Sequence, residues 1–356
     1  MRLDRIRRLC ADIEKSCANI GRGVQVMEVC GTHTVALFRF GIRSLLPKNL
    51  KLLSGPGCPV CVTEQSYIDT VIELAGRDDC IIATYGDMLR VPGRETSLEK
   101  LARKNIRIVL IADDAVKLAG QNPDKTVVFI AVGFETTTPA TAVAIAGAIE
   151  SGLENFTVLS SHKRVLPAMN ALLSDRNDKI DAFLCPGHVS VIIGSDAYAP
   201  IVERFKRPCV VAGFQAEQIL AGLAEICSQI ENNRPAVASV YSLAVSPQGN
   251  KIACSLIDKY FQPADGQWRG LGVIPQGCLK LKSQYSRFDA IERFGLQVKD
   301  SPEPPGCCCG QVLCGLLDPD DCPLFGAKCT PDHPVGPCMV STEGACAAWY
   351  KYGRER

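Results

Sequence analysis

Four cysteines near the end of the chain are spaced as ligands of a bulky metal cofactor would be. They follow the pattern Cys322-x6-Cys329-x8-Cys338-x7-Cys346, through a stretch rich in Pro and Gly. Cysteine thiolates hold iron–sulfur clusters, commonly four for a [4Fe-4S] cube, whereas structural zinc favours tight Cys-x2-4-Cys knuckles. The long spacings favour a [4Fe-4S] cluster over zinc, and a thiol-rich tail without metal is the third interpretation.

Three consecutive cysteines, Cys307, Cys308 and Cys309, precede these four. One of them could replace a cluster ligand, or two could form a disulfide-capable pair that passes electrons between the cluster and other thiols. In the simpler interpretation, one or two of the three have no part in the site. Cys314 lies in an apolar turn, and we assign it no role.

A second thiol site is indicated by the pair Cys58 and Cys61 in GPGCPVC, a string that follows an apolar strand and precedes a helix. In that position the first sulfur lies near the helix N-terminus, where backbone N–H groups stabilise a thiolate. Such a pair is nucleophilic, readily oxidised and able to chelate a soft metal. Half of a zinc site and a plain packing role are the alternatives.

A third site is indicated by Cys30 in the string CGTHT, directly after an apolar run. Open α/β folds place their ligands at the carboxyl edge of the sheet, so Cys30 and the Cys58 loop should lie at the same edge. Three soft sulfurs could then converge. His33 is a candidate second-shell donor or base, although Thr32 and Thr34 could merely cap the following helix.

The remaining motifs give weaker evidence for functional sites. Thr137 or Thr138 before Pro139, in GFETTTPATA, is typical of a capped helix N-terminus, which can also bind an anion, but no Walker lysine accompanies it. Cys185 and His188 in CPGH make no site by themselves. The other cysteines are expected to be small core residues: Cys10, Cys17, Cys80, Cys209, Cys227, Cys254 and Cys278.

Composition and charge limit the partners and the cellular compartment in which this chemistry takes place. The chain has 356 residues, 47% of them hydrophobic, and a formal net charge of +1, so no field steers it toward nucleic acid. The N-terminus mixes charged and apolar residues, which argues against a signal peptide or a membrane span. We therefore expect a cytoplasmic protein, in which nineteen cysteines serve metal binding, redox chemistry or packing rather than a disulfide framework.

Short apolar runs alternate with helical patterns, which predicts an α/β fold with mainly parallel sheets. We expect two Rossmann-like βαβ domains, at residues 1–122 and 123–234, and a smaller, irregular cysteine-rich iron–sulfur domain at 235–356. Candidate helices are 64–75, with Thr63 as a cap, 140–151 and 216–231. The expected strands are 24–29, 51–53, 80–84, 106–111, 127–132, 156–160, 182–184 and 209–212.

Taken together, the strings CGTHT, GPGCPVC, GFETTTP, PGHVS, WRGLGVIP and DCPLFG…CTPDHPVGPCMVSTEGAC resemble, in order and over nearly the whole chain, the hydrogenase maturation factor HypD family. The resemblance implies two α/β domains and a cysteine-rich domain with a [4Fe-4S] cluster, in a setting similar to ferredoxin:thioredoxin reductase. It also implies work with a HypC-type chaperone and a HypE-type cyanide donor to assemble the Fe(CN)2CO unit of [NiFe]-hydrogenase. Neither nucleic acid nor a membrane is an expected partner.

Carried over by motif, Cys30, Cys58 and Cys61 would hold or reduce an iron that transiently carries cyanide and carbonyl. The cluster ligands would be the four spaced cysteines of the tail, and Cys307 and Cys309 would match an upstream C-x-C-G element. These roles suit a redox scaffold rather than a conventional turnover enzyme. Low-valent iron with such ligands prefers soft thiolates. An exposed apolar patch near Cys30 would serve as the docking site of the chaperone.

The chain departs from the family pattern at two positions. Cys308 stands between the two cysteines of the C-x-C-G element, which leaves the identity of a redox pair open. Cys278 stands in PQGCL, where a serine–glycine pair is expected. The rival function is a self-contained, cluster-dependent thiol oxidoreductase that reduces Cys58 and Cys61, and a structural zinc protein is the third hypothesis.

Overall fold

The computed structural model describes residues 2–174, 179–298 and 301–353. Its strands form two sheets, as the alternating sequence pattern predicts. Sheet A is parallel throughout and has five strands in the order β2-β1-β7-β8-β9. Their bounds are β1 (Val24–Glu28), β2 (Leu50–Ser54), β7 (Ala182–Pro186), β8 (Cys209–Ala212) and β9 (Val237–Ser239).

Sheet B has six strands in the order β10-β11-β6-β5-β3-β4. Four of them are parallel, and the hairpin of β10 and β11 joins the edge of β6 in antiparallel orientation. The α/β class and the mainly parallel sheets are therefore confirmed. The bounds are β3 (Cys80–Thr84), β4 (Ile106–Ile108), β5 (Thr126–Gly133), β6 (Phe156–Lys163), β10 (Phe261–Trp268) and β11 (Gly272–Leu281).

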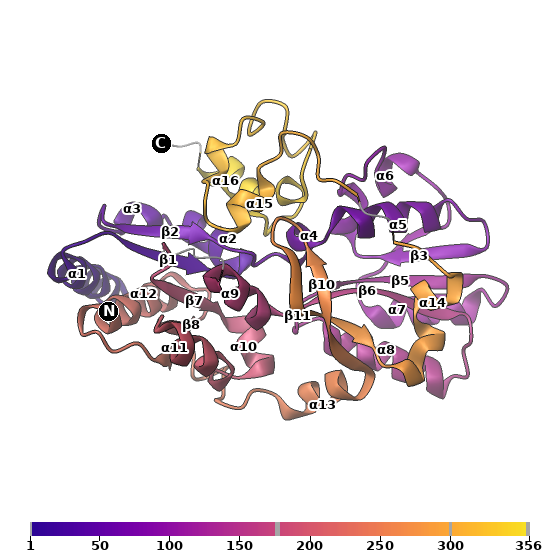
Figure 1. Ribbon diagram of the computed structural model, residues 1–356, viewed down its shortest axis with the longest axis horizontal. Helices are drawn as coiled ribbons and strands as arrows, with labels where there is room; N and C mark the ends of the chain where they lie inside the picture. Colours follow the sequence, from indigo (N-terminus) through magenta and orange to yellow (C-terminus); the bar gives the residue numbers. More distant parts are fainter. Residues whose placement is uncertain (1, 175–178, 299–300, 354–356) are drawn as a thin grey trace.

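Helices cover the sheets, and Figure 1 shows them around the two groups of strands. The helices of the first half are α1 (Arg2–Ile20), α2 (Gly31–Arg39), α3 (Ile42–Leu45), α4 (Pro59–Val62), α5 (Gln65–Ala75), α6 (Leu98–Leu101), α7 (Ala112–Gln121), α8 (Thr138–Glu150) and α9 (Val165–Ser174). Those of the second half are α10 (Gly187–Ile193), α11 (Ala199–Phe205), α12 (Ala216–Glu231), α13 (Lys251–Tyr260), α14 (Ala290–Phe294), α15 (Cys309–Leu313) and α16 (Ala345–Tyr352). Among the described residues, none of the helices has both the length and the apolar character that crossing a membrane requires.

The two sheets do not divide the chain at residue 122. Strands β1 and β2 belong to sheet A, but β3 and β4 pair into sheet B, and the chain returns to sheet A only with β7. After residue 234 the chain still contributes β9 to sheet A and the hairpin to sheet B. Local alternation indicates βαβ units, but it does not tell which sheet a strand joins, because strand pairing is a long-range choice.

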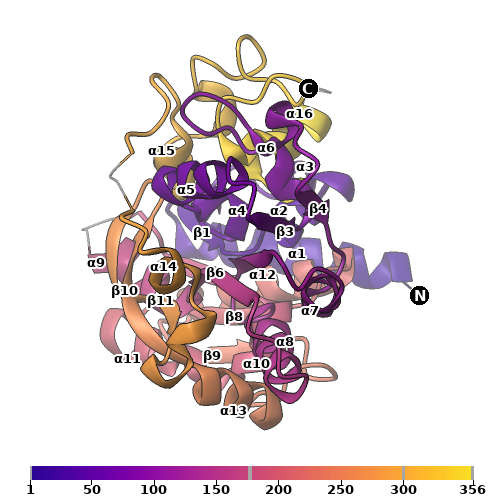
Figure 2. The same ribbon diagram turned by 90° about the vertical axis from the view of Figure 1, so that its right-hand side faces the viewer.

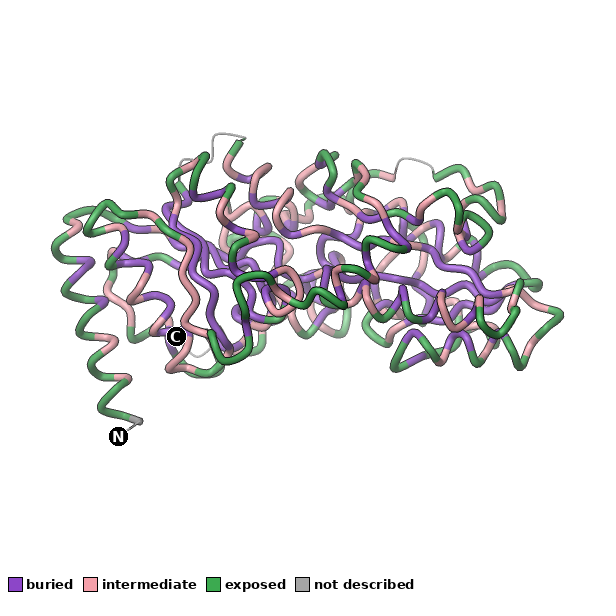
Figure 3. The backbone as a smooth tube through the Cα atoms, turned by 90° about the horizontal axis from the view of Figure 1, so that it is seen from below, coloured by how far each residue is buried: buried purple, intermediate pink, exposed green. Residues whose placement is uncertain are grey.

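Three hydrophobic cores hold these parts together. One lies between sheet A and helices α1 and α12, and a second lies between sheet B and helices α7 and α8. The third is shared: it includes Met27 of sheet A, Ile130 of sheet B and Cys338 near the end of the chain. Figure 3 shows the buried strands between more exposed helices. A continuous core therefore connects the cysteine-rich end of the chain with both sheets.

Residues 301–353, here called the cysteine-rich segment, contain short helices and loops. In Figure 1 this segment lies above the region between the two sheets, and the turn of the β10–β11 hairpin points toward it. Figure 2, turned by 90°, shows it on the same side as α2 to α6. The segment thus lies over the part of the molecule from which the thiol motifs emerge.

Two helix caps differ from expectation. The helix expected from residue 64 begins at Gln65, and Thr63 instead donates a 2.8 Å hydrogen bond to the Pro59 carbonyl of the preceding turn. Thr137 is the N-cap of α8, but its side chain makes no capping bond, and the Thr138 hydroxyl donates to the Phe134 carbonyl. These hydroxyls bond backwards to carbonyls of the preceding turn, so they do not accept from the helix N–H groups.

Candidate thiol redox and metal site

Cys30 and the Cys58 loop lie side by side, as the carboxyl-edge rule predicts. Strands β1 and β2 are parallel neighbours in register, and both motifs leave the sheet at the same edge. The Gly31 N–H donates a 3.1 Å hydrogen bond to the Gly57 carbonyl. A side chain at Gly57 would overlap the backbone of Cys30. Glycine is therefore required where the two motifs touch.

Cys58 and Cys61 form a disulfide with a Cα–Cα distance of 5.2 Å. Cys58 is the N-cap of the short helix α4, and its sulfur accepts a 3.2 Å hydrogen bond from the Cys61 N–H. The predicted position of the first sulfur at a helix N-terminus is confirmed. The exposed fractions of the two residues are 3% and 0%, so a bulky disulfide substrate cannot reach either sulfur in this state.

Cys30 is a buried free thiol at the N-cap of α2. Burial, with a smaller contribution from the nearby Glu343 carboxylate, raises the pKa of this thiol to about 12. The backbone N–H of His33 and the side chain of Thr32 act in the opposite direction but do not outweigh burial. Cys30 is thus protonated at neutral pH, and a metal that binds its sulfur must displace the proton.

The threonines of CGTHT do not cap the helix that follows Cys30. The Thr32 hydroxyl donates a 2.6 Å hydrogen bond to Glu343 of the cysteine-rich segment. The Thr34 hydroxyl donates at 2.9 Å to the buried Glu28 carboxylate. The capping interpretation of these residues is wrong, because both hydroxyls are engaged by carboxylates from other elements.

His33 is fully buried, and its ring points to the end of β8. Nε2 lies 3.1 Å from the Gly213 carbonyl oxygen, and the ring packs at a tilt against Phe214 with a centroid distance of 4.8 Å. Because a carbonyl oxygen only accepts, Nε2 must carry the proton. Burial lowers the His33 pKa to about 4, so the ring is neutral at pH 7. The side chain therefore acts as a donor that ties α2 to sheet A.

The cysteine-rich segment brings its predicted ligands together. All four spaced cysteines and the upstream trio line one apolar cavity, together with Leu324, Phe325 and Met339. The sulfurs of Cys309 and Cys338 are 2.7 Å apart. Cys314 does not line the cavity. The seven cysteines that do are Cys307, Cys308, Cys309, Cys322, Cys329, Cys338 and Cys346.

Hydrogen bonds between these thiols shift their pKa values in opposite directions. Bonds from Cys307 and Cys338 lower the pKa of Cys309, and the positive charge of Arg269 adds to the effect. The same bonds raise the pKa of Cys307 and that of Cys338, since each donates its proton. Cys309 is therefore the member of the trio that carries a thiolate most readily.

The side chains that line the cavity are of the type that binds an iron–sulfur cluster. The polar side-chain atoms at the cavity are sulfurs, the ligands that such clusters take, and apolar side chains surround them. Within the described ranges, however, no three or more His, Cys, Asp or Glu side chains are already arranged to hold a metal ion. Binding would therefore have to replace the present sulfur–sulfur hydrogen bonds with bonds to metal.

The cysteine-rich segment also contacts the Cys30 motif directly. A side chain at Gly31 would overlap the backbone of Glu343, and Trp349 of α16 packs edge-on against Phe38 of α2 at 5.3 Å between ring centroids. Glu343 stands in the string STEGAC, which gave no sign of this contact, because the two motifs are more than 300 residues apart. The two ends of the chain thus contact each other at the Cys30 motif.

Two buried cations adjoin the Cys58–Cys61 turn, and sequence reasoning found neither. Lys163 donates at 2.7 Å to Glu64 and lies 3.5 Å from the Cys278 sulfur. Arg269 donates at 2.9 Å to the Thr63 carbonyl. Arg269 stands in WRGLGVIP, and a charged residue between a tryptophan and a glycine was the available signal.

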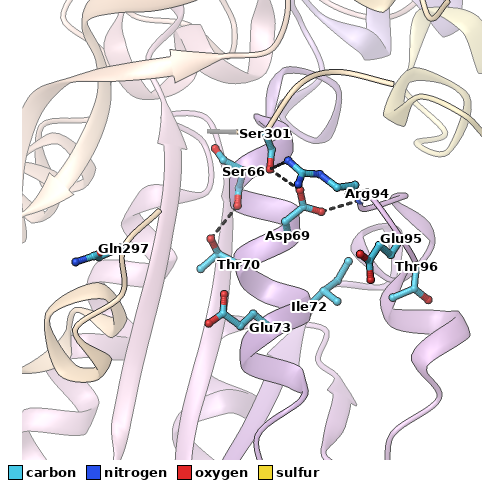
Figure 4. A pocket seen from close by; sticks show the side chains of 10 residues that line it. All are labelled: Ser66, Asp69, Thr70, Ile72, Glu73, Arg94, Glu95, Thr96, Gln297 and Ser301. Atoms are coloured by element: carbon cyan, nitrogen blue, oxygen red, sulfur yellow. Dashed lines mark hydrogen bonds between the residues drawn. The ribbon is translucent and has the colours of Figure 1, made fainter. Parts of the chain in front are cut away.

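A pocket of about 350 Å³ lies beside α5, away from the sulfurs. Figure 4 shows Asp69 at its wall, bonded to the backbone N–H of Arg94 and to the Ser301 hydroxyl. Its lining residues are Ser66, Asp69, Thr70, Ile72, Glu73, Arg94, Glu95, Thr96, Gln297 and Ser301. Asp69, Arg94 and Ser301 bond to one another, and we assign the pocket no role in the thiol chemistry.

Comparison with known proteins gives matches along nearly the whole chain. The HypD family model, described as "Hydrogenase formation hypA family", matches residues 4–353. The hydrogenase maturation factor HypD of Azotobacter vinelandii is 44% identical over 98% of this chain and 94% of its own length. The HypD proteins of Escherichia coli (43%; 94% and 90%) and Rhizobium leguminosarum (43%; 95% and 91%) are similarly close. The matched range contains every cysteine considered above.

Proposed function

This chain belongs to the HypD family of hydrogenase maturation factors, and from that premise we propose that it is a redox-active scaffold for assembly of the Fe(CN)2CO unit of a [NiFe]-hydrogenase. The observation that carries the proposal is the contact between the Cys30 edge and the cysteine-rich segment through Thr32 and Glu343. In this proposal, the thiols that bind iron are therefore next to the segment that supplies electrons.

In this proposal iron with its cyanide and carbonyl ligands is cargo, held by Cys30 and by one or both sulfurs of Cys58 and Cys61. A HypC-type chaperone supplies a further ligand, and a HypE-type protein delivers cyanide. The disulfide must open before its sulfurs can bind iron, a step that consumes two electrons and leaves two thiolates. Soft thiolates suit iron in a low oxidation state.

Cys322, Cys329, Cys338 and Cys346 would hold a [4Fe-4S] cluster as the resident cofactor. When bound, such a cluster supplies single electrons at a potential that its surroundings set. The thiols of the upstream trio lie at the wall of the same cavity. In this proposal Cys309 is the thiol that exchanges with a disulfide, because neighbouring thiols lower its pKa.

The docking site of the chaperone is proposed at the helices that follow Cys30. Phe40 and Leu45 are exposed, at 39% and 50%, just after α2 and at the end of α3. Exposed large apolar side chains near a functional thiol suit a partner surface. We place the protein in the cytoplasm, where the free thiols stay reduced.

One observation favours the rival function, a self-contained thiol oxidoreductase: Cys58 and Cys61 form a disulfide. Exchange with a protein substrate requires that the substrate sulfur reach the attacked sulfur. Cys58 and Cys61 are both buried. Burial therefore supports the scaffold over the oxidoreductase, because electrons from within the molecule reach this pair more easily than an outside disulfide does.

Anaerobic analysis of iron, zinc and sulfide tests the proposal, with wild type beside Cys30→Ala, Cys322→Ala and the control Cys314→Ser. The expected result is a sulfide-containing cluster in wild type, Cys30→Ala and Cys314→Ser, and its loss in Cys322→Ala. With the HypC-type chaperone present, additional iron should bind to wild type and not to Cys30→Ala. Zinc without sulfide would refute the cluster, and equal iron in wild type and Cys30→Ala would favour the oxidoreductase.

A further inference from the structure

Arg269 is fixed on the segment that directly follows Cys61. Its backbone N–H donates a 2.9 Å hydrogen bond to the Val62 carbonyl, and its Nε donates at 2.9 Å to the Thr63 carbonyl. Its Nη2 donates at 3.2 Å to Oε1 of Gln65. Main chain and side chain thus hold the guanidinium in one place at the end of the α4 turn.

The charge of Arg269 is buried without a carboxylate partner. The residue is 2% exposed, and it forms no salt bridge with any residue of the described ranges. Two carboxylates nearby are engaged elsewhere: Glu64 pairs with Lys163, and Glu303 accepts from the Gly270 backbone N–H. A buried cation without a counter-ion is costly, so its position calls for an anion that forms during function.

The other side of Arg269 faces the cysteine-rich segment. The next residue, Gly270, touches the backbone of Gly310, so closely that a side chain on either glycine would overlap the other. Gly310 follows Cys309 in α15, so this contact lies next to a cysteine that lines the cavity. Arg269 and Gly270 thus contact both the segment that follows Cys61 and the helix that begins at Cys309.

We propose that Arg269 is a positioning residue whose fixed positive charge stabilises the negative charge that the sulfur sites on either side of it gain on reduction. This inference rests on the proposed redox function. A fixed cation favours the more negative, reduced state of a nearby group, and it thereby raises the reduction potential of that group. The hydrogen bonds to Thr63 and Gln65 keep the charge in place while the sulfurs change oxidation state.

The inference predicts a shift in redox equilibrium when the charge is removed. With dithiothreitol as reductant, the Cys58–Cys61 disulfide becomes the Cys58 thiolate and the Cys61 thiol, dithiothreitol becomes its cyclic disulfide, and one proton passes to the buffer. In Arg269→Gln we expect the equilibrium constant for this reduction to fall about tenfold, equivalent to about 30 mV for a two-electron couple. Arg269→Lys keeps the charge, and we expect it to stay within about threefold of wild type.

The measurement is an anaerobic titration in dithiothreitol redox buffers, followed by alkylation and mass mapping of Cys58 and Cys61. Arg164→Gln is the matched control, because Arg164 bonds at 3.0 Å to the Gln276 carbonyl in the middle of β11 and not to the segment that follows Cys61. A spectroscopic potential titration of any bound cluster gives a second readout, in which Arg269→Gln should also lower the potential. Thermal unfolding of each variant reports stability separately.

Equal shifts in Arg269→Lys and Arg269→Gln, or a shift in Arg269→Gln no larger than in Arg164→Gln, would overturn the inference. If Arg269→Gln does not fold, a tenfold shift in Arg269→Lys would overturn it and an unshifted equilibrium would support it. A wild type without a cluster would refute the proposed cofactor, but the dithiothreitol titration would still decide the role of Arg269.

Discussion

The Thr32 hydroxyl donates a 2.6 Å hydrogen bond to the Glu343 carboxylate, which fastens the last part of the chain to the motif that contains Cys30. The bond joins residues 311 positions apart. The same carboxylate adds its negative charge to the surroundings of the Cys30 thiol. One residue of the cysteine-rich segment therefore both closes the site and makes the Cys30 thiol harder to ionise.

Replacing Glu343 by Gln should make Cys30 more reactive. Loss of the negative charge lowers the pKa of the Cys30 thiol, so we expect alkylation by iodoacetamide at pH 8 to become about three- to tenfold faster. Mass mapping of Cys30 measures the rate. Thr32→Val is the control, since it removes the same hydrogen bond and keeps the charge. An equal acceleration in Thr32→Val would indicate loosened packing instead of charge.

Gly57→Ala should be strongly destabilising, because the added methyl group would overlap the backbone of Cys30. We expect a loss of about 3 kcal/mol or more in the free energy of unfolding. Gly120→Ala, on the exposed side of α7, meets no atom within 4 Å and should instead stabilise by about 0.5–1 kcal/mol. Urea unfolding of both variants checks this contrast, and similar values for the two would contradict the close contact.

Cys308 should be the first of the three consecutive cysteines to react in metal-free protein. Cys309 has the lower pKa but is 3% exposed, whereas Cys308 is only partly covered. The solvent exposure of a thiol affects its reaction rate more here than its ionised fraction does. We therefore expect iodoacetamide to modify Cys308 about tenfold faster than Cys309. Differential alkylation with mass mapping gives the order. Labelling of Cys309 first would show that the cavity opens in solution.

Stability should fall between pH 4.5 and pH 8 because of Glu135. Its carboxylate is buried and accepts a 3.0 Å hydrogen bond from the Val165 N–H, and burial raises its pKa to about 7. The native state therefore binds this proton more tightly than the unfolded chain, and stability is lost as pH rises through the interval. Between pH 4.5 and pH 8, the free energy of unfolding of wild type should fall by at most roughly 3 kcal/mol relative to that of Glu135→Gln.

Urea unfolding of wild type and Glu135→Gln at pH 5 and pH 8 measures this difference. Glu150→Gln, at the exposed end of α8, is the control and should follow the wild-type pH dependence. Parallel pH dependences of wild type and Glu135→Gln would show that Glu135 is solvated in the native state.

The strands were predictable where they are buried on both faces. Each of the eight expected runs overlaps a strand, from β1 to β8, because parallel strands covered by helices are continuous apolar runs. The run 106–111 extends past β4, a largely exposed strand that ends at Ile108. Strand β9 and the β10–β11 hairpin were missed. In β10 buried residues stand only at the two ends, and the polar and small residues between them gave no strand pattern.

The sequence alone determined that Cys30, Cys58 and Cys61 lie at one sheet edge, because parallel strands end at a common edge. It also determined which cysteines have the spacing to surround a shared cavity. Only the tertiary structure decided that strands from both halves of the chain alternate between two sheets. It also decided that Glu343 and Arg269 adjoin the thiols. These contacts join residues more than 200 positions apart, and no local pattern of residue types records them.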